Sequence, residues 1–271
     1  MTRMSWFNTV SLTLGFAFLY IPIVILVIYS FNESKLVTVW AGFSTKWYGE
    51  LLRNDAFLNA AWVTIKVAVV SSTFATVLGT MAAYVMVRGG RFFGRTLFSG
   101  MIYAPLVMPE VITGLSLLLL FIGIGLDRGV LTIILAHTTF SMCYVSVVVS
   151  SRLVTFDRSI EEAALDLGCT PSEAFRLVTL PIIAPAVISG WLLAFTLSLD
   201  DLVIASFTSG PAATTLPIKI FSAVRLGVSP EINALSTIMI AIVATGVITT
   251  SLISKRQVVR QRREEQEAER S

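Results

Sequence analysis

Six apolar runs constrain this chain more than any other feature, because each is about long enough to cross a lipid bilayer as a helix. They lie at about 10–31, 59–87, 97–124, 129–151, 182–208 and 232–254. Charged residues make up only 14% of the 271 residues, whereas soluble proteins contain about 25%. A helix satisfies its own backbone hydrogen bonds in lipid. The sequence therefore predicts an all-α, polytopic membrane protein, with six transmembrane helices in one domain that covers residues 1–271.

The second apolar run carries a small residue at every fourth position. The residues of this stripe are Ser71, Ala75, Gly79 and Ala83. Small side chains let the backbones of two helices approach closely. The sequence therefore predicts that the second span packs tightly against another span along this stripe.

The segment 152–181, between the fourth and fifth runs, is too charged to lie in lipid and carries the signals of two helix starts. Ser159 is followed three residues later by Glu162, and Thr170 is followed in the same way by Glu173. Both pairs fit a capping box, and Pro171 would occupy the first helical position of the second helix. The segment is thus predicted to form two short helices.

Gly168 lies between these two helices and is expected to end the first one in a left-handed conformation. The first helix is expected to bury a face at helical spacing. That face consists of Ile160, Ala163, Ala164 and Leu167. The second helix is expected to stop at Leu180 and Pro181. Its apolar side consists of Ala174, Leu177 and Val178.

The order of residues in this segment resembles the EAA loop of the permeases of bacterial ABC importers. The residues that carry the resemblance are Glu162, Ala163, Ala164, Gly168, Leu180 and Pro181. In that family the loop lies in the cytoplasm and fits a cleft on the ATP-hydrolysing subunit. The resemblance implies the fold of a type I ABC importer permease and a role for these six residues in docking an ATPase. The alternative is a solvated hairpin without a partner.

Lysine and arginine are distributed unequally between the connections, and this inequality predicts the orientation of the chain. One side would hold Arg3, Arg88, Arg91, Arg95, Arg152, Arg158, Arg176 and the basic residues of the C-terminal tail. The other side would hold Lys35, Lys46, Arg53, Arg128, Lys219 and Arg225. The first side is richer. Both termini and the segment 152–181 are therefore expected to face the cytoplasm. The resemblance to bacterial permeases implies that the membrane is a bacterial inner membrane.

Three acidic residues lie inside apolar runs, where a charge near the centre of a span costs about 2.5–3.5 kcal/mol on insertion scales. Glu110 belongs to the third run, and Asp200 and Asp201 belong to the fifth. Adjacent helical residues point about 100° apart, so at most one of the two aspartates is expected to face a pore squarely. We interpret the three as lining a substrate path. The alternative is that they pair with Lys66 or cap a broken helix.

Three further stretches are similar to the polyamine branch of these permeases. They are 195–201, 210–217 and 229–234. The similarity implies a flexible aliphatic cation such as putrescine as the substrate, carried by alternating access. Such a cation needs separated carboxylates with apolar or aromatic walls between them, and aromatic rings attract cations directly. The candidate wall residues are Trp191, Phe195 and Phe207.

The resemblance also implies a set of partners. They are a homologous permease that forms the other half of the pore, two cytoplasmic ATPase subunits, a periplasmic polyamine-binding protein and membrane lipid. ATP hydrolysis would belong to the ATPase subunits, so we expect no catalytic residue and no cofactor in this chain. Three other functions remain open. One is an importer permease for another small cation or an amino acid, and the second is a secondary transporter in which Glu110 and Asp200 relay protons. The third is a membrane-embedded hydrolase, against which the lone His137 without a partnered nucleophile argues.

Several residues resemble parts of nucleotide, metal or nucleic-acid sites, but each lacks a feature that such a site requires. The segment 88–96 nearly has P-loop spacing, but it has arginine where the motif needs lysine and it follows no buried strand. His137 lies in an apolar run, and no second ligand lies at metal spacing from it. We therefore expect His137 to be a hydrogen-bonded residue in helix packing and not a metal ligand. Cys143 and Cys169 are expected to be free thiols. Glutamates offset the basic residues of the C-terminal tail, which argues against nucleic-acid binding.

Overall fold

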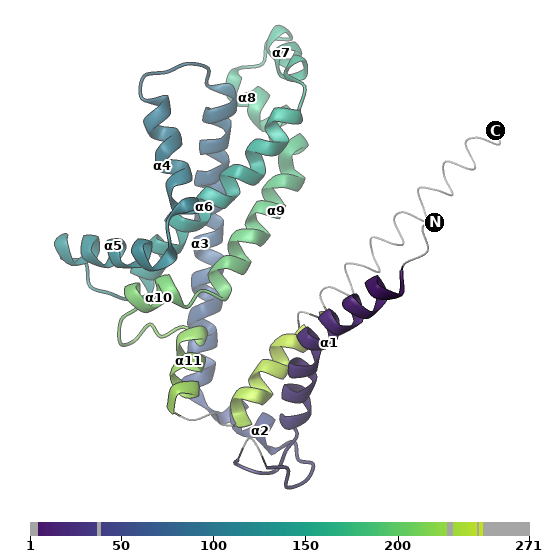
Figure 1. Cartoon of the computed structure of the whole chain (residues 1–271). Helices are drawn as coiled ribbons and strands as arrows, with labels where there is room; N and C mark the ends of the chain where they lie inside the picture. Colours follow the sequence, from purple (N-terminus) through teal and green to yellow (C-terminus); the bar gives the residue numbers. More distant parts are fainter. Residues whose placement is uncertain (1–4, 37–38, 227–229, 243, 246–271) are drawn as a thin grey trace. The chain divides into compact units, whose positions relative to one another are not determined.

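The computed structural model describes residues 5–36, 39–226, 230–242 and 244–245, and these ranges are mainly helical (Figure 1). The elements are α1 Trp6–Tyr29, α2 Lys46–Arg53, α3 Asp55–Arg88, α4 Arg95–Val107, α5 Glu110–Gly123, α6 Val130–Thr155, α7 Arg158–Asp166, α8 Pro171–Ala174, the π-helical η1 Phe175–Thr179, α9 Leu180–Leu199, α10 Val203–Thr208 and α11 Leu216–Leu226. A further apolar helix covers Pro230–Ile242. Within the described residues there is no strand, only an isolated bridge between Asn32 and Phe43. The prediction of an all-α fold is confirmed.

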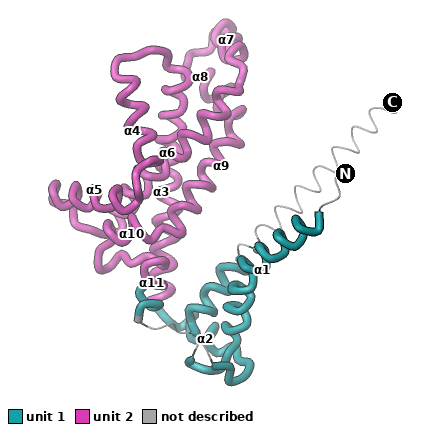
Figure 2. Tube along the Cα trace, viewed as in Figure 1, with its two compact units in different colours: residues 1–55, 222–271 teal, residues 56–221 magenta. Residues whose placement is uncertain are grey.

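The chain divides into two compact units, which Figure 2 shows in different colours. One unit comprises Met1–Asp55 with Ser222–Ser271, and the other comprises Ala56–Phe221. In the first unit, α1 is apolar and contains no buried residue, as expected of a helix that faces lipid. Asn32 organises the connection that follows α1. Its side-chain amide donates to the Val39 carbonyl oxygen at 2.7 Å, and its backbone carbonyl oxygen accepts from Trp47 Nε1 at 2.7 Å.

The second unit is built on the long helices α3, α6 and α9. A buried cluster joins them and consists of Ala75, Ala83, Val145, Val149, Leu153, Ile183 and Ala194. All four small residues of the stripe on α3 are buried. A Cβ on Gly79 would lie 2.6 Å from the Met142 carbonyl oxygen and 2.8 Å from Val145 Cβ, so only glycine allows α6 to approach this closely. The predicted tight packing along the stripe is confirmed.

Four helical stretches are long and apolar enough to cross a membrane, and a fifth is reached if the bent pair α4 and α5 counts as one span. The four are Trp6–Tyr29, Asp55–Arg88, Val130–Thr155 and Pro171–Leu199. The expected sixth span, 232–254, is described only at 232–242 and 244–245, and its remainder lies outside the described residues. The described part of the chain thus accounts for up to five of the six expected spans.

The third run, expected at 97–124 with breaks at Pro105 and Pro109, consists of two helices bent by 118°. The break at Pro109 is confirmed, whereas Pro105 lies inside α4. α4 ends at Val107 and α5 begins at Glu110. Pro109 has no backbone N–H to donate, and it disfavours the helical conformation in the residue before it. Met108 is accordingly extended, with φ −75° and ψ 136°. The break places Glu110 at the start of a helix rather than in the middle of one.

The fifth run, expected at 182–208, is also corrected. α9 ends at Leu199 and α10 begins at Val203, so Asp200 and Asp201 lie in the connection between two helices. α10 packs against α5 and α6. This second break brings the two aspartates near the first break, from which α5 begins.

Candidate functional site

The hairpin formed by α7 and α8 carries most of the expected docking residues and lies at one end of the second unit (Figure 1). Asp157 is the N-cap of α7, because its Oδ1 accepts from the Ser159 backbone N–H at 3.0 Å. This hydrogen bond lowers the pKa of the Asp157 carboxyl. Aspartate caps helices as well as serine does, and the predicted Ser159–Glu162 capping box is therefore wrong. Glu162 instead forms an exposed ion pair with Arg158 at 3.1 Å.

The first helix of the hairpin contacts the bundle through a narrower face than the sequence predicted. On α7 only Glu161 and Ala164 are buried. Ala163, Ile160 and Leu167 were expected to be buried as well, but all three are exposed. The two buried positions are three residues apart and so share one side of the helix. The other apolar side chains of α7 are at the surface of this chain.

The turn between the two helices has the predicted conformation. Gly168 has φ +92°, in the left-handed region that glycine tolerates best. Thr170 and Glu173 form the predicted capping box. The Thr170 backbone N–H donates to Glu173 Oε2 at 2.8 Å, and the Glu173 backbone N–H donates to Thr170 Oγ1 at 3.3 Å. Pro171 occupies the first helical position, as predicted.

The second helix does not stop at Leu180 and Pro181, contrary to the sequence prediction. The chain continues from α8 through η1 into α9, and these elements together form the stretch Pro171–Leu199. A proline is tolerated in the first turn of a helix, and Pro181 is the second residue of α9, which begins directly after the π-helical segment. The hairpin is therefore continuous with the fifth span.

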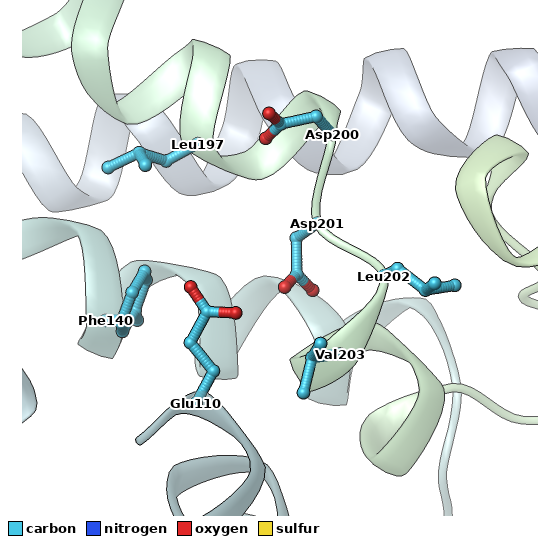
Figure 3. Close-up of a pocket in the computed structure, with 7 residues that line it drawn as sticks. All are labelled: Glu110, Phe140, Leu197, Asp200, Asp201, Leu202 and Val203. Carbon is cyan, nitrogen blue, oxygen red and sulfur yellow. The ribbon is translucent and has the colours of Figure 1, made fainter. Parts of the chain in front are cut away.

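Glu110, Asp200 and Asp201 line one pocket of about 250 Å³ (Figure 3). Its other lining residues are Phe140, Leu197, Leu202 and Val203. Glu110 comes from the start of α5, and the two aspartates come from the connection between α9 and α10. In Figure 3 the carboxylates of Glu110 and Asp201 point into the same space. The structure thus brings together the three acidic residues singled out in the sequence.

Asp201 has structural partners inside this pocket. Its carboxylate accepts from the backbone N–H of Ala205 at 2.7 Å and of Ile204 at 3.3 Å, so it caps α10. Its Oδ2 also lies 3.0 Å from Nε2 of the buried His137. The alternative expectation, that an acidic residue caps a broken helix, therefore holds for Asp201.

His137 is the hydrogen-bonded packing residue that the sequence predicted. Its Nδ1 lies 2.7 Å from Ser198 Oγ, to which Ser71 Oγ donates at 3.1 Å. This buried chain of polar groups runs from α3 through α9 and α6 to Asp201. No local pattern predicts that His137 and Asp201 meet, because they are 64 positions apart in the sequence.

Glu110 and Asp200 have fewer side-chain interactions than Asp201. Within the described residues, no hydrogen bond or ion pair joins either carboxylate to another residue, and both residues are exposed. Lys66, the expected alternative partner, is also exposed. Glu110 is the first residue of α5, where the partial positive charge of a helix N-terminus stabilises an anion. These two carboxylates are therefore the ones able to receive a cation.

The aromatic residues expected as walls do not line the pocket. Trp191 and Phe195 stack on each other on α9, with ring centroids 5.3 Å apart, and Trp191 Nε1 donates to Thr73 Oγ1 at 3.2 Å. Phe207 packs close to Gly114 of α5. The aromatic residue in the pocket is Phe140 of α6. Phe140 was not among the predicted site residues, although it lies three residues from His137 and hence on the same side of the helix.

Residues 75–263 match the family described as the inner membrane component of binding-protein-dependent transport systems. The chain belongs to this family. Its fold agrees with that of solved ABC transporters. One neighbour is a bacterial ABC transporter that imports the acidic polysaccharide alginate, with a TM-score of 0.72, 17% identity, and coverage of 92% of this chain and 99% of the other. Another is the MetNI methionine ABC transporter, with a TM-score of 0.59, 16% identity, and coverage of 77% and 95%.

Two curated relatives are much closer in sequence. The chain is 62% identical over 252 residues to the putrescine transport system permease protein PotI of Escherichia coli strain K12, which covers 91% of this chain and 89% of the relative. It is 44% identical over 244 residues to the spermidine/putrescine transport system permease protein PotC of the same strain, with 90% and 92% covered. The chain is therefore similar to polyamine permeases over nearly its whole length.

Proposed function

We propose that this chain is the permease subunit of an ATP-driven importer that carries polyamine, with putrescine as the first candidate, into the cytoplasm. The observation that carries the proposal is the convergence of Glu110, Asp200 and Asp201 on one pocket. The 62% identity to a protein named for putrescine transport supports the same substrate class. The second unit thus contains both the hairpin of an importer permease and an acidic pocket.

The pocket has the chemistry that a short aliphatic diamine requires. Putrescine carries an ammonium group at each end of a hydrocarbon chain, and Glu110 and Asp200 are two carboxylates that can meet such groups. At an effective dielectric constant near 20, an ammonium about 4 Å from a carboxylate gains roughly 4 kcal/mol. Phe140 can add a cation–π contact of about 0.5–2 kcal/mol. Leu197, Leu202 and Val203 provide apolar surface for the methylene groups.

The hairpin is the proposed docking element for an ATPase. Its exposed residues include Glu162, Ala163 and Gly168, while Ala164 packs inward, and Leu180 and Pro181 join the hairpin to α9. We assign this end of the unit, and both chain termini, to the cytoplasm. Two ATPase subunits, a homologous permease and a periplasmic polyamine-binding protein would complete the transporter. ATP binding would close the ATPase pair and open the spans outward, and hydrolysis would reset them.

The experiment that tests this proposal is purification of the chain in detergent, followed by hydrolysis assays on the complex. Co-purification of an ATPase subunit is expected, and the binding protein loaded with putrescine should stimulate hydrolysis. Binding protein loaded with other small cations or amino acids serves as the comparison. Stimulation by one of those ligands alone would replace the polyamine assignment. Isolation of a transport-competent chain without any ATPase would point to a secondary transporter.

A further inference from the structure

Glu161 is an unusual residue in the hairpin, because it is buried in a helix whose other charged side chains are exposed. It is 8% exposed, whereas the side chain of the adjacent Glu162 is 60% exposed. A carboxylate is seldom buried unless it is paired. Glu161 therefore has a role on the inner side of α7, where a docked ATPase would not reach it.

Glu161 links the ends of three spans, two through its own carboxylate and the third through Arg88. Its Oε2 lies 2.8 Å from Arg88 Nε, at the end of α3. Its Oε1 accepts from Thr179 Oγ1 at 2.7 Å, at the residue before α9. Arg88 Nη2 in turn donates to the Phe156 carbonyl oxygen at 3.2 Å, at the end of α6, and its guanidinium lies 5.5 Å from the centre of the Phe156 ring. We call these four residues the Glu161 junction.

The buried ion pair between Glu161 and Arg88 is better explained by a role in positioning α7 than by a contribution to the stability of the fold. Removing two charges from water is costly, so a buried pair often stabilises a fold no better than apolar residues of the same size. Removal of one partner, however, leaves an uncompensated buried charge. The pair therefore keeps α7 in one register against α3, and Thr179 extends that constraint to α9. A displacement of α7 must carry these helix ends with it or break the pair.

We propose that Glu161, paired with Arg88, is a positioning residue through which movement of the hairpin is transmitted to the spans. Its role differs from that of the exposed residues of the hairpin, which would contact the ATPase. This inference rests on the proposed function, because it assumes that the hairpin moves with an ATPase. It predicts that loss of the pair uncouples hydrolysis from transport while the ATPase still binds.

The test compares Glu161→Gln, Arg88→Gln and the double variant, each in the complete transporter reconstituted into vesicles. Putrescine uptake, ATP hydrolysis and co-purification of the ATPase are measured for each. Each single variant should lower the ratio of putrescine taken up to ATP hydrolysed by about tenfold, with co-purification unchanged. The double variant should be no worse than either single one, because both changes remove the same interaction. Asp166→Asn removes an exposed carboxylate from the same helix and should keep the parent ratio.

Thr179→Val is the milder test if the charge variants fail to reach the membrane. It deletes only the hydroxyl that donates to Glu161 and should lower the same ratio about threefold. An unchanged ratio in Thr179→Val and in the charge variants that assemble would overturn the inference, as would additive losses in the double variant. Loss of ATPase co-purification in Glu161→Gln would overturn it too, since Glu161 would then shape the docking surface. If the parent itself shows no ATP-dependent uptake, the proposed function fails first.

Discussion

The three carboxylates of the pocket are chemically unequal, and backbone breaks explain the difference. Glu110 begins α5 and benefits from the positive end of that helix. Asp201 is held by the N–H groups that begin α10 and by His137. Asp200 is the C-cap residue of α9 and is one of the residues that line the pocket (Figure 3). We therefore propose that Glu110 and Asp200 contact the substrate and that Asp201 positions the pocket wall.

This assignment predicts that the two aspartates respond differently to substitution. Asp201→Ala removes the cap of α10 and should lower the free energy of unfolding by about 0.5–2 kcal/mol. Asp201→Asn should lower it much less, because asparagine also caps helices. Asp200→Asn should leave stability unchanged and reduce uptake. Thermal unfolding of the purified protein in detergent measures the first two effects, and parent-like unfolding of Asp201→Ala would contradict the capping role.

At the scale of elements, long apolar runs were predictable and their interruptions were only partly so. The spans at α3 and α6 match the predicted runs closely, since helical periodicity and length are local properties of the sequence. Pro109 signalled a break in the third run, but no local signal marked the break at Asp200 or the π-helical entry into α9. The pocket depends on those breaks. Glu110, Asp200 and Asp201 could therefore be predicted as site residues from the sequence, but Phe140 and His137 could not be predicted as their neighbours.

The left-handed turn of the hairpin leads to a second prediction. Gly168 has open space around its Cα, so only the backbone conformation restricts the residue type. Gly168→Val should cost about 1–2 kcal/mol locally, whereas Gly168→Asn should be tolerated better because asparagine visits the left-handed region. The valine variant should insert into the membrane and lose transport. Uptake and membrane abundance measured together check this, and full transport by the valine variant would show that the turn does not matter.

The close approach of α3 and α6 leads to a third prediction. Gly79→Ala places a methyl group against the Met142 carbonyl oxygen and should destabilise the protein by about 1–3 kcal/mol. Gly100→Ala is the matched control, because a Cβ there meets no atom within 4 Å. A lower unfolding temperature for Gly79→Ala alone is the expected result. Equal unfolding temperatures for the two variants would mean that α3 and α6 can separate without cost.

At the scale of the whole chain, α9 is the element that connects the hairpin to the pocket. It continues from the hairpin through η1 and ends beside Asp200. A helix of 20 residues is about 30 Å long, close to the hydrocarbon thickness of a bilayer. The hairpin and the pocket therefore lie at opposite ends of one span, as a coupling mechanism with a cytoplasmic ATPase and an outward-opening substrate site requires.

The orientation of the chain gives a fourth prediction. Reporters fused after Arg95, Ser172 and Arg256 should lie in the cytoplasm, and reporters near Trp47 and Ala213 should lie in the periplasm, because lysine and arginine favour the cytoplasmic side. Reporter activity in whole cells measures this. A periplasmic signal at Ser172 would contradict the docking of the hairpin to an ATPase.

We propose that this permease passes a polyamine along Glu110 and Asp200, driven by ATP that the ATPase subunits hydrolyse. The decisive measurement is putrescine uptake by the reconstituted transporter, with the double variant Glu110→Gln/Asp200→Asn beside the parent. We expect ATP-dependent uptake by the parent and at least about a tenfold reduction in the double variant, with the ATPase still bound in both. Equal uptake by the two proteins, or no ATP-dependent putrescine uptake by the parent, would contradict it.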